Sequence, residues 1–294
     1  MRSLFDVPAP AKLNLFLHVT GRRPDGYHLL QSAFMLIDWH DTLHFETRSD
    51  GRISREDIGA VLPEADLIVR AARALQAFAK PAPGAHIVVE KRIPSQAGMG
   101  GGSSDAASCL LALNRLWDLR LPLSALTAIG LKLGADVPFF LQGRNAWVEG
   151  IGEKMQPLEI PSARFLVVKP AQGLDTSMIF SHSHLTRDSK TATISGFAAD
   201  PFGFGRNDLQ KVAQSLCPGV TEGLEWLQGK GFRGRMTGSG SAIFAHLRDC
   251  AVPAPLNEPW SDAPQDWQLR ECENLSVHPL MGWALSDGLT VGSA

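Results

Sequence analysis

A glycine-rich stretch lies between a predicted strand and a predicted helix. Residues 94–105 read Pro-Ser-Gln-Ala-Gly-Met-Gly-Gly-Gly-Ser-Ser-Asp, with four glycines in five consecutive positions. Glycine costs backbone entropy on folding, so packing alone explains this density poorly. Backbone amides that curl around a ligand and end at a helix N-terminus bind phosphate well. The stretch therefore predicts a phosphate loop with Ser103 and Ser104 as N-cap candidates, and an ordinary glycine turn is the alternative.

Two well-known phosphate motifs do not fit this stretch. The Walker A motif needs Gly-Lys followed by Ser or Thr, whereas Gly229-Lys230 is followed by Gly231. The dinucleotide motif G-x-G-x-x-G fails because Ser103 stands at the position of its last glycine. The sequence therefore indicates a phosphate loop of another type.

Lys12 and Asn14 lie two residues apart in the largely apolar run 7–19. Alternation puts the leucines of this run on one face of a strand and Lys12 with Asn14 on the other. A lysine and an asparagine on one strand face reach the same ligand, so the pair is a candidate for the site. A solvated edge strand is the alternative.

Tyr27 and His28 follow a turn at residues 21–26, and Tyr27 is the only tyrosine of the chain. The pair offers stacking and hydrogen bonding to a flat heterocycle. Partly buried packing is the more ordinary explanation for such a pair.

Asp136 stands among apolar residues in Gly134-Ala135-Asp136-Val137-Pro138. Proline disfavours a helical residue before it, and a carboxylate is costly to bury without a partner. Asp136 is therefore either a functional carboxylate or a helix cap.

A second glycine-serine turn, at residues 237–240, runs into a predicted strand and is a candidate partner of the first loop. An ordinary turn is again the alternative. His182 and His184 have the spacing of metal ligands, but chance explains one surface pair better.

Apolar periodicity predicts the elements that position these residues. Predicted strands cover residues 7–19, 85–90 and 165–170, and predicted helices cover 66–79, 106–117, 123–133, 208–216 and 220–227. Residues 186–206 and 251–264 are predicted to be loops. The pattern breaks near residues 157–164, which predicts two domains, 1–160 and 161–294.

The composition is that of a globular protein, with 44% hydrophobic residues, 20% charged residues and a net charge of −2. This charge argues against a nucleic-acid or membrane partner, and no apolar run reaches the length of a membrane span. We expect no secretory signal, and the scattered cysteines predict reduced thiols and a cytoplasmic location.

Three separated stretches together resemble the motifs of the GHMP small-molecule kinases. They are Pro8-x-Pro10-Ala11-Lys12-Leu13-Asn14-Leu15, the loop from Pro94 to Ser104, and Met236-Thr237-Gly238-Ser239-Gly240. Gly26-Tyr27-His28 and Gly134–Pro138 look like one branch of that superfamily, which acts on a cytidine-diphosphate-linked methylerythritol. The resemblance spans residues 7–245.

The resemblance implies a reaction and a set of roles. That branch transfers the γ-phosphate of ATP, with Mg²⁺, to the 2-hydroxyl of the methylerythritol portion of its substrate, in the non-mevalonate route to isoprenoids. It implies Asp136 as general base and Lys12 as its electrostatic partner. The implied magnesium ligands stay unassigned.

The resemblance also implies the binding residues. Those expected to bind ATP are Lys91, Pro94, Gln96, Ala97, Gly98, Met99, Gly100, Gly101, Gly102, Ser103, Ser104, Asp105 and Asp66. Those expected to bind the phosphate acceptor are Asn14, Tyr27, His28, Phe34, Ile151, Thr176, Phe180, Gly238, Ser239 and Gly240. Among these, Tyr27, His28 and Phe180 would form the cytosine pocket.

Two positions depart from the family pattern. Gln96 replaces a frequent glycine in the phosphate loop, and Asp66 replaces a frequent asparagine near the adenine. A carboxylate accepts hydrogen bonds and donates none, so Asp66 cannot reproduce an amide donor. Both changes bear on nucleotide affinity rather than on the type of reaction.

The fold that the resemblance implies is a two-domain α+β structure. Its N-terminal half contains a left-handed βαβ unit shared with a ribosomal protein domain, and its C-terminal half is ferredoxin-like. Another GHMP kinase and a catalytically silent nucleotide-binding protein of this fold are the alternative functions. The chain is expected to be a monomer or a homodimer.

Overall fold

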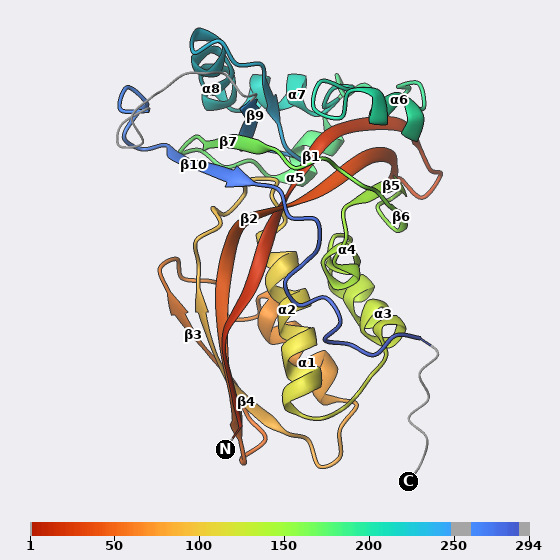
Figure 1. Cartoon of the computed structure of the whole chain (residues 1–294), viewed down its shortest axis with the longest axis vertical. Coiled ribbons are helices and arrows are strands. Elements are labelled where there is room, and N and C mark those ends of the chain that lie inside the picture. The colour runs from red at the N-terminus through yellow and green to blue at the C-terminus, as the bar shows by residue number, and fades with distance from the viewer. Residues whose placement is uncertain (1, 248–259, 288–294) are drawn as a thin grey trace.

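A long antiparallel hairpin runs through most of the molecule and joins its two parts (Figure 1). It consists of β1 (Ser3–Arg22) and β2 (His28–Arg48), in a computed structural model that describes residues 2–247 and 260–287. The predicted strand 7–19 lies within β1, and its residues are buried except for the half-buried Pro8. The alternative of a solvated edge strand is therefore wrong.

The first sheet has the order β3-β4-β2-β5-β6, and β1 pairs with β2 beside this path. Its remaining strands are β3 (Ile53–Ile58), β4 (Gly84–Glu90), β5 (Ala146–Gly150) and β6 (Lys154–Pro157). Strands β3 and β4 are parallel, and α1 (Leu67–Gln76) connects them. This arrangement is the βαβ unit expected in the N-terminal half.

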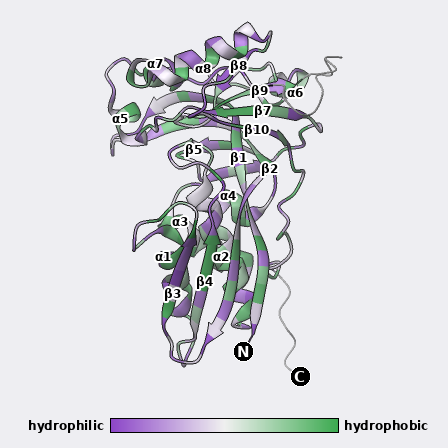
Figure 2. Cartoon of the chain, turned by 90° about the vertical axis from the view of Figure 1, so that its left-hand side faces the viewer, coloured by the Kyte–Doolittle hydropathy of each residue, from purple (hydrophilic) through white to green (hydrophobic). Residues whose placement is uncertain are grey.

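Four helices lie against this sheet and share one apolar core with it. Besides α1 they are α2 (Gly101–Leu116), α3 (Leu123–Leu133) and α4 (Val137–Gln142). Helix α2 is buried along almost its whole length, and Figure 2 shows the helices of this part behind the strands of the sheet. The predicted helices at 66–79, 106–117 and 123–133 are confirmed, with ends that differ by a few residues.

The second sheet has the order β10-β7-β9-β8 and lies at the other end of the hairpin. Its strands are β7 (Arg164–Lys169), β8 (Gly234–Met236), β9 (Ile243–Leu247) and β10 (Gln268–Glu273). The helices of this part are α5 (Thr176–Ser181), α6 (Ile194–Ala199), α7 (Gln210–Leu216) and α8 (Pro218–Gly229).

Helix α6 lies inside the predicted loop 186–206. The polar composition of that segment concealed the helix, which is held by the buried ring of Phe197 and by a Thr193 side chain that caps its N-terminus. The description of 186–206 as a loop was therefore wrong. The predicted loop 251–264 lies mostly outside the described residues.

After β10 the chain returns to the first sheet. The amide of Leu275 donates to the carbonyl oxygen of Leu36, and the amide of His278 donates to that of Gly143. Asn145 fixes this return, because its side chain accepts from the amide of Leu36 and donates to the carbonyl oxygen of Leu275. The proposed boundary near residue 160 falls between β6 and β7.

None of the helices described here combines the length and the apolar character that crossing a bilayer requires.

Candidate active site

Lys12 and Asp136 meet at the junction of β1, the glycine loop and α4. The Lys12 Nζ lies 3.6 Å from Oδ2 of Asp136 and 2.5 Å from Oδ1 of Asn14. It also lies 4.4 Å from the centre of the Phe34 ring, within the range of a cation–π contact. Burial lowers the pKa of the Lys12 ammonium, and the Asp136 carboxylate opposes this effect. The structure therefore brings together four residues predicted for the site.

Asp136 occupies the N-cap position of α4, but its side chain caps nothing. The carboxylate is 31% exposed, whereas the Lys12 side chain is 5% exposed. The structure therefore separates the two explanations offered for Asp136. Its backbone begins the helix, while its side chain faces Lys12 and open space in which a hydroxyl group could approach.

The glycine loop and the second glycine-serine turn interlock. A Cβ atom on Gly98 would lie 2.3 Å from the carbonyl oxygen of Thr237, and one on Gly238 would lie 2.5 Å from that of Gly98. Both glycines have positive φ angles, +70° and +52°. This contact confirms the prediction that the two segments are partners. The backbones can approach so closely because Gly98 and Gly238 have no side chains.

Asn14 and Lys12 tie the strand β1 to both segments through their backbone. The amide of Lys12 donates to the carbonyl oxygen of Met99 at 3.0 Å, and the amide of Asn14 donates to Oγ1 of Thr237 at 2.9 Å. The three stretches that resembled family motifs are thus hydrogen-bonded to one another.

The N-cap of α2 is Gly100, in the left-handed region with φ 72° and ψ 17°. The prediction of Ser103 or Ser104 as N-cap was wrong, since α2 already begins at Gly101. The hydroxyl of Ser104 donates to the carbonyl oxygen of Pro10 at 2.7 Å instead. A Cβ on Gly100 would lie 3.4 Å from Cε of Lys12 and 3.0 Å from the Phe140 ring, so this glycine makes room for the lysine.

Gln96, the departure from the family pattern, has a positive φ of 50°. Its carbonyl oxygen accepts from the amide of Ser241 at 3.0 Å. The first turn of the loop thus has a left-handed backbone conformation at residue 96, which glycine favours, although this residue is a glutamine.

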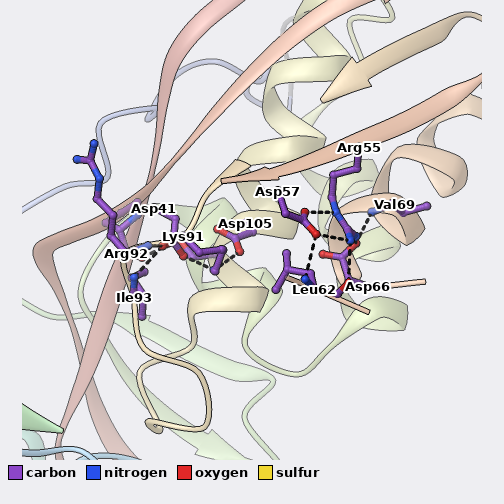
Figure 3. Close-up of polar contacts among 12 residues, drawn as sticks. Asp41, Arg55, Asp57, Leu62, Asp66, Val69, Lys91, Arg92, Ile93 and Asp105 are labelled. Carbon is purple, nitrogen blue, oxygen red and sulfur yellow. Dashed lines mark hydrogen bonds and ion pairs between the residues drawn. The ribbon is translucent and has the colours of Figure 1, made fainter. Parts of the chain in front are cut away.

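A buried cluster of two carboxylates and one lysine lies where the chain enters the glycine loop (Figure 3). Nζ of Lys91 binds Asp41 and lies 2.6 Å from Oδ2 of Asp105, while Oδ1 of Asp105 is buried without a partner among the described residues. Oδ1 of Asp41 accepts from the amides of Arg92 and Ile93 at 2.5 and 2.7 Å. Asp41 therefore fixes the path of the chain from β4 into the glycine loop.

The charges of this cluster do not balance, because two carboxylates face one ammonium. Burial raises the pKa of the Asp105 carboxyl to about 8 against the charge of Lys91, and the carboxylate of Asp41 adds to the increase. Burial acts to lower the pKa of Lys91, but the two carboxylates outweigh it and raise that pKa.

Asp66 belongs to a second cluster, beside the first in Figure 3. Its Oδ1 accepts from Nη1 of Arg55 at 2.5 Å and from the amide of Val69 at 3.0 Å, which caps α1. Arg55 holds Asp57 through Nε and Nη2 as well. The carboxylate at this position therefore has a cationic partner in Arg55 and also caps a helix.

The residues predicted for the cytosine pocket lie at the turn end of the hairpin. The rings of His28 and Phe180 are 5.1 Å apart and inclined by 34°. Tyr27 is 61% exposed, on the tip of the turn. Helix α5 connects this pocket to the phosphate loops, because Thr176 at its start shares a 2.6 Å hydrogen bond with Ser239.

Ile151 lies in the turn between β5 and β6, where its amide donates to Oε2 of Glu153 at 2.6 Å. A Cβ on the next residue, Gly152, would lie 3.9 Å from Cβ of Ala135. This turn is therefore next to the residue that precedes Asp136.

Sequence reasoning missed four residues that organise these groups. They are Asp41, Arg55, Arg187 and Asn207. The side chain of Asn207 donates to the carbonyl oxygens of Met236 and Gly238 at 2.8 Å each, and so holds the second turn. Only Asp41 carried a usable signal, as an acidic residue at the start of an alternating apolar segment.

Magnesium prefers oxygen ligands and is commonly bound by one or two carboxylates together with phosphates and water. Within residues 2–247 and 260–287, no three His, Cys, Asp or Glu side chains are grouped to hold an ion. The side chain of Asp136 is 31% exposed, whereas that of Asp105 is 1% exposed and paired with Lys91. The residues therefore fit an ion that arrives with the nucleotide phosphates, which together with water would supply its oxygen ligands.

Comparison with known proteins defines the class. The family models for the GHMP kinase N-terminal domain and the GHMP kinase C-terminal region match residues 66–144 and 195–249. A crystal structure of homoserine kinase from Cytophaga hutchinsonii covers 95% of this chain and 96% of its own, with a TM-score of 0.66. At 14% identity, that likeness shows the fold alone. The fold is that of the GHMP kinases.

Two further relatives define the branch. The 4-diphosphocytidyl-2-C-methyl-D-erythritol kinase of Albidiferax ferrireducens is 66% identical over 295 residues, covering 100% of both chains. A crystal structure of 4-(cytidine 5'-diphospho)-2C-methyl-D-erythritol kinase is 34% identical, covers 83% of this chain and 90% of its own, and has a TM-score of 0.69. The chain belongs to the 4-diphosphocytidyl-2-C-methyl-D-erythritol kinase family.

Proposed function

We propose that this chain phosphorylates the 2-hydroxyl of 4-diphosphocytidyl-2-C-methyl-D-erythritol with ATP, a step of the non-mevalonate route to isoprenoids. The observation that carries the proposal is the approach of Lys12 to Asp136 beside the interlocked glycine segments. Family membership supplies the identity of the phosphate acceptor.

In the proposed mechanism Asp136 accepts the proton of the attacking hydroxyl. The new bond forms between that oxygen and the γ-phosphorus, the bond to the β-phosphate oxygen breaks, and ADP leaves. The Lys12 ammonium offsets negative charge on the transferred group. Asn14 holds that ammonium at 2.5 Å, and Phe34 limits its movement from one side.

The glycine loop supplies the binding of the triphosphate in this proposal. The loop runs directly into α2, which is 16 residues long and whose N-terminus favours a phosphate, and Met99 of the loop accepts a hydrogen bond from the amide of Lys12. Lys91, Asp105 and Asp66 are proposed to lie near the adenine. When bound, Mg²⁺ neutralises charge on the phosphates.

The cytidine end is proposed to occupy the pocket of Tyr27, His28 and Phe180. Along α5, Thr176 contacts Ser239 of the second turn while Phe180 contacts His28, so one helix borders both the phosphate end and the base end. Ile151 would contact the acceptor near Asp136. We also propose a cytoplasmic location and a monomer or homodimer.

A substrate panel separates the candidate functions. ADP formation is measured with the cytidyl diphospho-methylerythritol, mevalonate and homoserine, and turnover is expected with the first alone. Turnover with mevalonate or homoserine alone would favour another GHMP kinase activity. A thermal shift with ATP without ADP formation from any acceptor would indicate a silent nucleotide-binding protein.

Asp136→Asn tests the base. It preserves shape and removes the proton acceptor, so kcat should fall by about 10²–10⁴-fold. Asp50→Asn is the control, because Asp50 is paired with Arg48 on the exposed surface. Near-normal kcat for Asp136→Asn would contradict the assignment.

A further inference from the structure

Arg187 lies in the segment after α5 and directs its guanidinium at the pocket assigned to cytosine. Its Nε donates to Nε2 of His28 at 3.0 Å. Its other groups donate to the carbonyl oxygens of Phe180, His182 and Leu185 at 3.1, 2.8 and 3.0 Å. Within the described part of the chain, these partners are one ring nitrogen and three backbone carbonyl oxygens. Arg187 therefore holds the His28 ring and the backbone at residues 180–185.

The contact determines the hydrogen-bonding character of His28. A guanidinium keeps its protons in proteins, so Nε2 of His28 must accept. In a neutral imidazole the remaining nitrogen then carries the proton, which makes Nδ1–H a donor. Burial, Arg187 and Arg22 each lower the pKa of His28, which is consistent with the neutral ring.

Arg187 also fixes the second wall of the pocket. Its bond to the carbonyl oxygen of Phe180 holds the end of α5, and the Phe180 ring lies 5.1 Å from the His28 ring. One side chain therefore sets both the tautomer of His28 and the spacing between two pocket residues that are far apart in sequence.

We propose that Arg187 is a positioning residue that fixes His28 as an Nδ1–H donor and thereby makes the pocket select cytosine over uracil. This inference rests on the proposed function. The ring atom N3 is an acceptor in cytosine and carries a hydrogen in uracil. A fixed Nδ1–H donor of His28 pairs with the N3 acceptor of cytosine. Against uracil the same donor faces the N3–H donor, so both donors are left without an acceptor.

The test compares cytidine and uridine forms of the diphospho-methylerythritol acceptor. The unmodified chain should favour the cytidine form by about tenfold or more in kcat/KM, as expected when one buried donor loses its acceptor. Arg187→Met should bring this ratio close to one, mainly through a higher KM for the cytidine form, and Arg187→Lys should restore part of it.

Arg23→Met is the matched control. Arg23 is a cation of the same hairpin turn, and it pairs with Asp25 at the surface rather than with His28. Its loss should leave the cytidine preference unchanged. A preference that falls equally in both variants would mean that local positive charge is responsible, and would overturn the proposal.

Nitrogen NMR of the His28 ring gives a readout that a merely structural role would not move. The unmodified protein should show a protonated Nδ1, and Arg187→Met should shift the ring toward protonated Nε2. A protonated Nε2 in the unmodified protein would refute the inference, even if the variant failed to fold. Absence of activity on both acceptors would overturn the proposed function, whereas activity without base preference would overturn this inference alone.

Discussion

Gly98→Ala is the sharpest perturbation of the interlocked loops. The added Cβ would lie 2.3 Å from the carbonyl oxygen of Thr237 and 2.7 Å from the amide nitrogen of Gly240. Both neighbours are backbone atoms, so no side chain can turn aside. The φ of +70° at this position adds strain for any residue with a Cβ.

The cost can be worked from these two terms. A left-handed residue other than glycine costs about 1–2 kcal/mol, and moving packed backbone by several tenths of an ångström costs about as much again. A penalty of about 3 kcal/mol on the closed arrangement of the loops corresponds to about 100-fold. We therefore expect kcat/KM for ATP to fall by about that factor.

Gly102→Ala is the matched control within the same loop. Its Cβ would meet only Cδ1 of Leu67, at 3.7 Å, which is ordinary contact. Because Gly102 is helical, alanine should stabilise the fold by about 0.5–1 kcal/mol and raise the Tm by a few degrees. Thermal unfolding compares the two variants, and ATP titration is applied to Gly98→Ala alone because Gly102 is itself expected to bind ATP. If Gly98→Ala had the same ATP affinity and the same Tm as the wild type, the close contact between the glycine loop and the second glycine-serine turn would be refuted.

Three further results are expected. Asp105 binds a proton more tightly in the folded state than in the unfolded state, so the free energy of unfolding falls as pH rises from about 4 toward 8. Asp105→Asn should remove this pH dependence and be more stable than wild type at pH 8.5 by about 1 kcal/mol. An unchanged pH dependence in the variant would contradict the raised pKa of Asp105. Burial lowers the pKa of His278 to about 4, so the unfolded state binds the proton first as pH falls. The free energy of unfolding should therefore drop by roughly 3 kcal/mol at most between pH 6.5 and 4. Denaturant titrations of His278→Asn should show a smaller loss of unfolding free energy over this pH range. Phe16 is fully buried against Trp147 and Phe197, so Phe16→Ala should cost about 3–5 kcal/mol in chemical unfolding, and a loss below 1 kcal/mol would show that the packing is not as described.

Local patterns in the sequence predicted the parts of the site that are local. A strand, a glycine loop and a helix follow one another at residues 85–117, and their periodicity was enough to locate all three. Asp136 was recognisable because burying a carboxylate among apolar residues is costly unless it has a partner or a function. The family resemblance then joined Lys12 to it, and the structure places the two groups 3.6 Å apart.

Contacts between distant residues could not be predicted in this way. Asp41 and Lys91 are 50 residues apart, and His28 and Arg187 are 159 apart. Neither pair has a spacing or a local pattern that reports on its partner. Tertiary context also decided the cap of α2, since Ser104 looks like a capping residue but its hydroxyl has a carbonyl partner on β1.

The return of residues 274–287 to the first sheet has a consequence for the order of events during synthesis. The side chain of Asn145 bridges Leu36 and Leu275, and 130 residues separate it from the latter. A ribosome releases the first sheet, α2, Lys12 and Asp136 long before Leu275 emerges. Asn145 therefore gains its partner Leu275 only after nearly the whole chain has been synthesised, so the N-terminal part folds before this contact can form.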